Sequence, residues 1–271
     1  MEGRERGEQR AYSELMDLML DENKRRLKAR KLIAILKHAL GRDDLTGLTA
    51  LDVGCSAGFI ADELARAGAR TLGVDIDRPG LLRAHANFGH RVGFCLSRAE
   101  RLPLDGASVD VAVLNHIYEH VVDPIAVLAD IHRVLRPGGV LYLGLGHRWQ
   151  LVEPHYRLPL LSWLPQRVAD QYVRLTGKAD HYYERYYTPR GLRRWVEAFD
   201  TWDYTLSVIA EPDRFAGLDT IPRWASHVPE SLLRVGLPLI PSYLWVGFKG
   251  TGEPAGPALR IAPQRLPKRG S

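Results

Sequence analysis

A glycine-bearing turn at residues 51–58 and an acidic residue beyond it have the types and spacing to hold a nucleoside ligand. The turn reads Leu-Asp-Val-Gly-Cys-Ser-Ala-Gly and follows an apolar segment. Gly54 and Gly58 let the backbone approach a ligand, because neither carries a Cβ. Asp75 ends the next apolar segment, at the offset of ~20 residues expected of a ribose-binding acid. A carboxylate suits this role because it can accept from both ribose hydroxyls.

A nicotinamide-dinucleotide fingerprint, Gly-x-Gly-x-x-Gly, fits the same turn poorly. Gly54 matches the first position, but Ser56 stands at the second and Phe59 at the third. The third glycine of that fingerprint lets the helix pack closely on the strand, so Phe59 argues against it.

The turn also spells Gly-x-Ser-x-Gly, the pattern that presents a nucleophilic serine in α/β hydrolases. That serine follows several strands and an oxyanion loop, whereas only a charged helix precedes the first predicted strand here. A serine hydrolase that uses Ser56 is therefore the less favoured alternative.

The third interpretation is a turn that holds S-adenosylmethionine. Gly54 and Gly58 would let the backbone meet its aminoacyl end, and Asp75 would bind its ribose. Each residue alone is also explained as an ordinary turn glycine or loop carboxylate. Their order along the chain favours the cofactor.

The composition is that of a globular protein of 271 residues, with 45% hydrophobic and 25% charged residues. No apolar run approaches the ~20 residues of a membrane span, and residues 1–10 are too polar for a secretory signal. The only cysteines, Cys55 and Cys95, fall on or beside predicted buried strands, so we expect reduced thiols and a cytoplasmic location. The net charge of +5 is spread over many helices, which argues against a nucleic-acid partner.

The elements that position the turn alternate as in an α/β protein. After an amphipathic helix at 12–40, strands are predicted at 49–53, 70–75, 91–96, 109–115 and 139–146, with helices at 57–67, 79–88 and 123–135. The strands are apolar without polar alternation, which is typical of a parallel sheet with helices on both faces.

The pattern changes after residue 149. Residues 150–187 contain three prolines and six of the eleven tyrosines, and a connection of this length indicates a lid or binding element. Thr188 and Pro189 then open a helix through Phe199. Strands at 202–210 and 243–249 are predicted to close the domain. We thus expect an N-terminal helical segment at 1–44, one domain at 45–250 and a disordered tail at 251–271.

Four segments resemble the class I S-adenosylmethionine-dependent methyltransferases, in particular the small-molecule branch with the ubiquinone and menaquinone enzymes. They are LDVGCSAG at 51–58, GVDID at 73–77, RAERLPLDGASVDVAVLNHIYEHV at 98–121 and IHRVLRPGGVLYL at 131–143. The resemblance implies a Rossmann-like, seven-stranded, mostly parallel sheet whose last hairpin is reversed. It also implies S-adenosyl-L-methionine as cofactor and S-adenosyl-L-homocysteine as product.

The resemblance assigns cofactor roles by position. The methionine end would lie along Asp52, Gly54, Ser56 and Gly58, the ribose on Asp75, the adenine against Ile76 and Ala99, and the sulfonium beside Asn115. The chain departs from the family at two places. Serine replaces a usual glycine at position 56, and Arg98 replaces an aspartate that accepts from the adenine amino group. An arginine cannot accept, and Glu100 is the nearest substitute.

Methyl transfer to a hydroxyl needs alignment, exclusion of water and a base. Histidine is the natural base because its pKa lies near working pH. His116 and His120 follow the fourth predicted strand and His147 the fifth, so each is a candidate catalytic residue as well as a plausible loop or structural one. A metal site from His116, Glu119 and His120 lacks persuasive ligand spacing, and no metal is expected.

The aromatic segment 150–187 is the candidate acceptor site, with Tyr156, Trp163, Tyr182 and Tyr183 as substrate contacts. A packed cap over the sheet explains the same residues equally well. Trp163 with its neighbouring arginines could also touch a membrane surface. We expect O-methylation of a hydrophobic or aromatic small molecule, such as a natural-product, lipid-linked or glycosylated acceptor. The alternatives are a non-catalytic methyltransferase-like binding protein and the Ser56 hydrolase.

Overall fold

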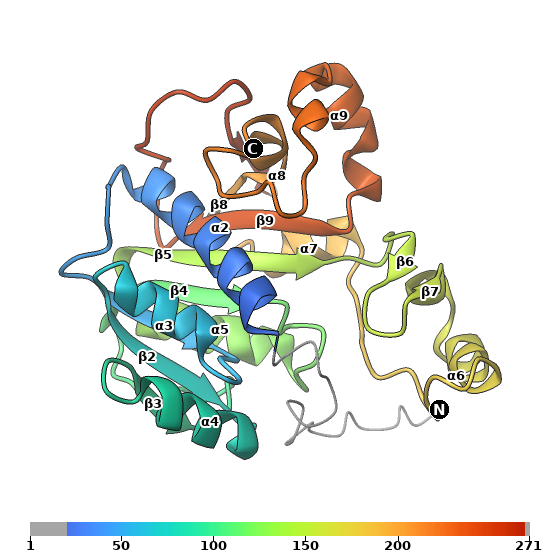
Figure 1. The fold of residues 1–271 in the computed structure, drawn as a ribbon, viewed down its shortest axis with the longest axis horizontal. Helices are drawn as coiled ribbons and strands as arrows, with labels where there is room; N and C mark the ends of the chain where they lie inside the picture. The colour runs from blue at the N-terminus through green and yellow to red at the C-terminus, as the bar shows by residue number, and fades with distance from the viewer. Residues whose placement is uncertain (1–20, 269–271) are drawn as a thin grey trace.

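The computed structural model describes residues 21–268, and at its centre lies an eight-stranded sheet in the order β10-β8-β9-β5-β4-β1-β2-β3 (Figure 1). Its strands are β1 (Thr49–Val53), β2 (Arg70–Asp75), β3 (Gly93–Leu96), β4 (Val109–Asn115), β5 (Leu135–Gly146), β8 (Asp200–Asp203), β9 (Ser242–Phe248) and β10 (Gln264–Arg265). Strands β1 to β5 pair in parallel, and β9 runs antiparallel to β5 and β8. The predicted fold class is confirmed, with one strand more than the seven expected.

Helices cover both faces of this sheet. The helices are α2 (Glu22–Leu40), α3 (Phe59–Arg66), α4 (Arg78–Phe88), α5 (Pro124–Val134), α7 (Pro189–Trp195), α8 (Thr205–Ala210) and α9 (Glu230–Gly236), with 3-10 turns η3 (Arg223–His227) and η4 (Leu237–Leu239). Helices α5 and α7 lie on one face of the sheet, and α2, α3 and α8 lie on the other (Figure 1). Their apolar side chains belong to two separate buried clusters. Because β1 to β5 are parallel, their carboxyl ends and the loops that follow them lie at one edge of the sheet.

Helix α2 forms because its ends are capped and one face is apolar. The side chain of Asp21 accepts from the backbone N–H of Lys24, and Gly41 ends the helix with a φ of 62°. Leu32 and Leu36 are buried against the sheet. Residues 12–20 of the predicted helix lie outside the described residues.

Two expectations for the C-terminal part are wrong. Only the start of 202–210 is a strand, since the Asp203 carboxylate accepts from the N–H of Thr205 and opens α8. Part of the predicted disordered tail adds β10, where the Arg265 guanidinium donates to both carboxylate oxygens of Asp200 at 2.7 and 2.8 Å. Ile261 is buried as well. This tail is held by an ion pair and an apolar contact that its composition does not reveal.

Residues 150–187, called the lid below, lie beside the carboxyl ends of β4 and β5 (Figure 1). The lid contains the two-stranded ribbon β6 (Val152–Glu153) and β7 (Leu158–Pro159), the turn η2 (Leu161–Trp163) and helix α6 (Gln166–Leu175). It has a small apolar core of its own. Among residues 21–268, no helix is both long enough and apolar enough to cross a bilayer.

Candidate active site

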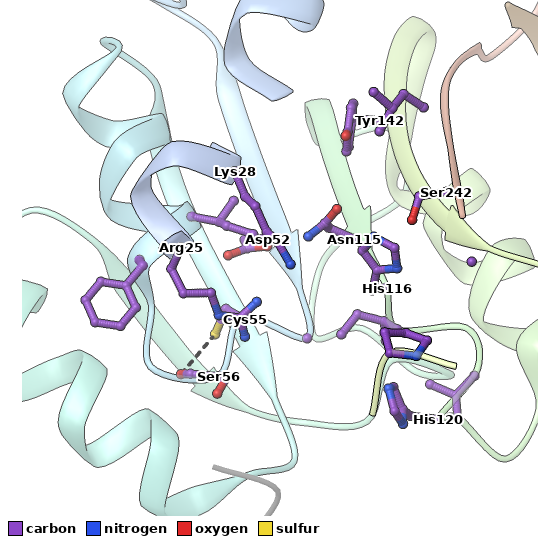
Figure 2. Close-up of a pocket in the computed structure, with 18 of the residues that line it drawn as sticks. Arg25, Lys28, Asp52, Cys55, Ser56, Asn115, His116, His120, Tyr142 and Ser242 are labelled. Carbon is purple, nitrogen blue, oxygen red and sulfur yellow. Dashed lines mark hydrogen bonds between the residues drawn. The ribbon is translucent and has the colours of Figure 1, made fainter. Parts of the chain in front are cut away.

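A cavity of about 660 Å³ opens at the carboxyl ends of the parallel strands, where α/β sheets bind ligands. Most of the residues predicted for the cofactor and the chemistry line it: Asp52, Gly54, Ser56, Asp75, Ile76, Ala99, Asn115, His116 and His120. The fold thus brings together side chains from β1, β2, β4 and the loops that follow them. Figure 2 shows several of these residues around the cavity.

Backbone hydrogen bonds fix the glycine turn and Asp75 to each other. The N–H of Ser56 donates to Asp75 Oδ2 at 2.7 Å, and the N–H of Asp77 donates to Oδ1 at 2.8 Å. Burial raises the pKa of Asp75, and these two donors oppose that rise. The carboxylate is therefore held rigidly at the mouth of the turn, as ribose binding requires.

Gly54 is needed for both its conformation and its space. Its φ is 76°, and a Cβ there would run into the side chain of Ile117. We expect Gly54→Ala to lower the free energy of unfolding by about 2–4 kcal/mol, which combines the left-handed strain with overpacking. Gly47→Ala is the matched control, because Gly47 also has a positive φ but a Cβ would meet nothing within 4 Å. In urea denaturation, the free energy of unfolding should fall more for Gly54→Ala than for Gly47→Ala. Equal decreases in the two variants would contradict the packing argument.

The resemblance implied that Gly58 lines the cofactor site, but Gly58 is not among the residues that line the cavity. It begins α3 with a φ of 80°, and a Cβ would press against Ala84 and Phe94. Gly58 therefore lets α3 pack on its neighbours instead of contacting a ligand. Ser56, by contrast, lines the cavity with a φ of 46°, a conformation that explains why glycine is usual at its position.

Asp52 is a buried acid that faces the cavity. Only 1% of the residue is exposed, and Oδ2 has no hydrogen-bond partner among the described residues. Burial raises the pKa of Asp52 to about 7. Such a carboxylate is suited to pair with a cationic ligand group.

Basic side chains on α2 also line the cavity, which the sequence analysis missed. Lys24, Arg25, Lys28 and Lys31 all line the cavity. Figure 2 shows Arg25 near the glycine turn and Lys28 extending toward Asn115. The charged residues of the amphipathic helix were the available signal. These cations make the cavity suitable for a ligand carboxylate.

The loop after β4 pairs a histidine with a buried acid. His116 has a φ of 56°, and its Nδ1 lies 3.4 Å from Oε1 of Glu119. Burial alone would raise the pKa of Glu119, but the contact with His116 lowers it on balance. An ionised Glu119 orients the imidazole and leaves Nε2 of His116 available.

The other two candidate bases differ from His116. Burial lowers the pKa of His120 to about 4, and this ring lies beside His155 and Glu184 of the lid. His147 is wholly buried outside the cavity wall, with Nε2 at 2.5 Å from the carbonyl of Ile240 and Nδ1 accepting from a backbone N–H. Both ring nitrogens of His147 are therefore engaged, which favours the structural role over that of a base.

None of the four predicted acceptor contacts lines the cavity. Tyr182 belongs to the lid's apolar core, and the ring of Tyr156 packs edge-on against it. Trp163 and Tyr183 are partly exposed, and the indole of Trp163 donates to the carbonyl of Gln150. The lid reaches the cavity with Gln150, Pro154, His155 and Tyr186 instead.

At the end that the resemblance assigns to the adenine, the cavity is lined by Ile76, Ala99, Arg98 and Glu100. Nε of Arg98 lies 3.7 Å from Oε2 of Glu100. A carboxylate acceptor is therefore present near the position where the family has its aspartate.

Comparisons with known proteins agree with this geometry. Residues 51–143 match the family model described as a methyltransferase domain. A ubiquinone biosynthesis O-methyltransferase of Parvibaculum lavamentivorans is 31% identical over 129 residues, which are 44% of this chain and 50% of the relative. A protein of the same name from Methylobacterium is 30% identical over 171 residues, 60% of this chain and 63% of the relative. The chain thus spans between half and two thirds of these relatives.

Solved structures show the same fold. The PH0226 protein of Pyrococcus horikoshii superposes with a TM-score of 0.58 at 16% identity, covering 88% of this chain and 97% of that one. An S-adenosylmethionine-dependent methyltransferase of Mesorhizobium loti gives 0.52 at 18% identity, covering 76% and 92%. The family match identifies residues 51–143 as a methyltransferase domain, and the relatives and the shared fold agree with it.

Proposed function

We propose that this protein is an O-methyltransferase that acts on a hydrophobic or aromatic small molecule in the cytoplasm. The observation that carries the proposal is the pairing of His116 with the buried Glu119 at the cavity that also contains the glycine turn. Both cysteines are free thiols, which supports a reducing compartment.

The residues around the turn fit the cofactor. Asp52 would pair with the ammonium of the aminoacyl end, Arg25 with its carboxylate, and Asp75 with the ribose hydroxyls. The unpartnered, buried Oδ2 of Asp52 (within the described part of the chain) is the observation that favours this orientation. When bound, S-adenosylmethionine supplies a methyl group activated by its sulfonium.

His116 would act as the base for an acceptor hydroxyl. Its Nδ1 faces Glu119, so Nε2 can take the proton while the carboxylate stabilises the imidazolium that forms. This need for a base favours oxygen as the methylated atom. The name that the two curated relatives share, ubiquinone biosynthesis O-methyltransferase, supports the same class of reaction.

The lining of the cavity favours an apolar acceptor. Val121 and Val122 follow the loop of His116, while Ile221, Ile240 and Leu244 contribute from the C-terminal segments. Aliphatic walls of this kind suit a flat ring or a lipid chain. Contact of Trp163 with a membrane surface is a further part of this proposal.

The two alternatives make different demands on the site. A serine hydrolase needs a histidine beside Ser56, yet the buried Ser56 hydroxyl has no hydrogen-bond partner within residues 21–268. A non-catalytic binding protein would retain the cofactor site without turnover. We expect Ser56→Ala to keep methyl transfer within about threefold, because the substitution removes only a hydroxyl that has no hydrogen-bond partner among the described residues.

Calorimetric titration with S-adenosylhomocysteine tests the proposal. Wild type should bind saturably, and Asp75→Ala should bind at least 30-fold more weakly, because two charge-assisted ribose contacts are lost. Asp44→Ala is the control, since Asp44 is an exposed loop carboxylate. No binding by wild type would overturn the assignment of the cofactor, and equal binding by Asp75→Ala would overturn that of the ribose. Methyl transfer from labelled cofactor to a panel of phenols separates an enzyme from a binding protein.

A further inference from the structure

Three buried carboxylates meet two histidines where the lid contacts the loop after β4. Glu119, Glu153 and Glu184 are exposed by only 1%, 0% and 4%, and His120 and His155 lie among them. Oε2 of Glu184 has no hydrogen-bond partner among the residues that the structure describes. Buried carboxylates are costly unless a cation or a set of donors compensates them. The cluster therefore favours the binding of a positive ion.

The ligand atoms of three of these residues converge. One donor atom each from His120, His155 and Glu184 lies within 4.8 Å of the other two, and Nδ1 of His120 is 3.8 Å from Oε1 of Glu184. We propose that His120, His155 and Glu184 bind a divalent metal ion, with Zn²⁺ as the best match to two imidazoles and one carboxylate. Closing to metal-bonding distances needs side-chain shifts of about 1 Å, because ligands of a tetrahedral zinc ion lie ~3.4 Å apart.

Glu153 would orient one of the ligands. Its Oε1 lies 2.7 Å from Nδ1 of His155, and its Oε2 accepts the backbone N–H groups of His155 and Tyr156 at 2.8 Å each. A metal-binding histidine commonly gives its other ring nitrogen to a carboxylate, which fixes the ring and raises its basicity. Nε2 of His155 is thereby left for the metal.

The proposed metal site adjoins the cavity in which the acceptor would bind. His120 and His155 line the cavity, whereas Glu184 lies behind them. Three protein ligands leave a tetrahedral ion one open position, and here that position would face the cavity. The metal would then join the lid to the edge of the sheet and take a water or an oxygen of the acceptor. The sequence did not predict this site, because His155 and Glu184 are distant in the chain from His120.

Metal binding can be measured without any acceptor, so its outcome is separate from that of the proposed methyl transfer. Dialysed wild type titrated with Co²⁺ should develop visible absorption typical of a four-coordinate ion at one equivalent, and Zn²⁺ should displace it. His155→Ala and Glu184→Gln should each weaken binding at least 100-fold. Glu153→Gln, which removes an orienting contact, should weaken it about 10- to 100-fold.

His181→Ala is the matched control, since His181 is a partly exposed lid histidine near Asp170 and outside the cluster. It should bind Co²⁺ as wild type does. Circular dichroism and S-adenosylhomocysteine titration show whether each variant is folded. The proposal is overturned if wild type binds less than about 0.2 equivalents, or if folded His155→Ala and Glu184→Gln bind as tightly as wild type.

Discussion

Asp52→Asn should make the ligand-free protein more stable at pH 8 while leaving its stability near pH 4 little changed. The pKa of Asp52 is about 7 in the folded protein, against ~3.9 in an unfolded chain. The folded state therefore binds the proton more tightly, and stability is lost as pH rises from ~4 through about 7. Asparagine has no such titration. The gain at pH 8 is bounded by about 4 kcal/mol, at 1.36 kcal/mol per pKa unit, and urea denaturation at both pH values measures it.

The same substitution should weaken S-adenosylhomocysteine binding by about 100-fold at pH 8, because a neutral amide replaces the carboxylate opposite the ligand ammonium. Wild-type affinity should fall as pH drops below about 7, where Asp52 takes up its proton, and the variant should show a flatter profile. Asp105→Asn, at an exposed turn, is the control and should match wild type in both measurements. A variant that is less stable at pH 8, or that binds as tightly as wild type, would show that Asp52 does not face the ammonium.

The sequence was informative about one half of the site, the glycine turn and the acid that follows it. The turn and Asp75 are encoded locally: apolar strands, a glycine with positive φ and an acid at a fixed offset. Parallel pairing then brings the ends of β1, β2 and β4 together, since carboxyl ends of parallel strands share an edge. The five predicted parallel strands overlap the observed β1 to β5 for this reason.

The other half of the site depends on contacts between distant segments. Helical periodicity shows that α2 has a basic face, but only the packing of α2 on the sheet turns Lys28 toward Asn115. The lid's tyrosines likewise indicate an aromatic element, but not that Tyr182 fills the lid's own core while Tyr186 reaches the cavity. Burial of a side chain is a property of the tertiary structure, and aromatic content alone does not specify it.

His116→Ala should lower kcat by about 10²- to 10⁴-fold without changing the affinity for S-adenosylhomocysteine, because the residue would serve proton removal and not cofactor binding. Glu119→Gln should lower kcat less, since the imidazole remains but loses the carboxylate that stabilises its charged form. His90→Ala, an exposed residue after α4, should leave both values unchanged. Steady-state kinetics with a methylated phenol and calorimetry on the same preparations measure the two effects.

The pH dependence of kcat separates His116 from His120. A base must be unprotonated, and the pKa of His120 is held near 4 by burial, so an enzyme that relied on His120 would keep its activity down to about pH 4. If His116 is the base, the acid limb of the wild-type profile should disappear in His116→Ala. An acid limb near pH 4 that persists in His116→Ala would instead assign the proton transfer to His120, and would place the base on the same ring that the proposed metal site requires.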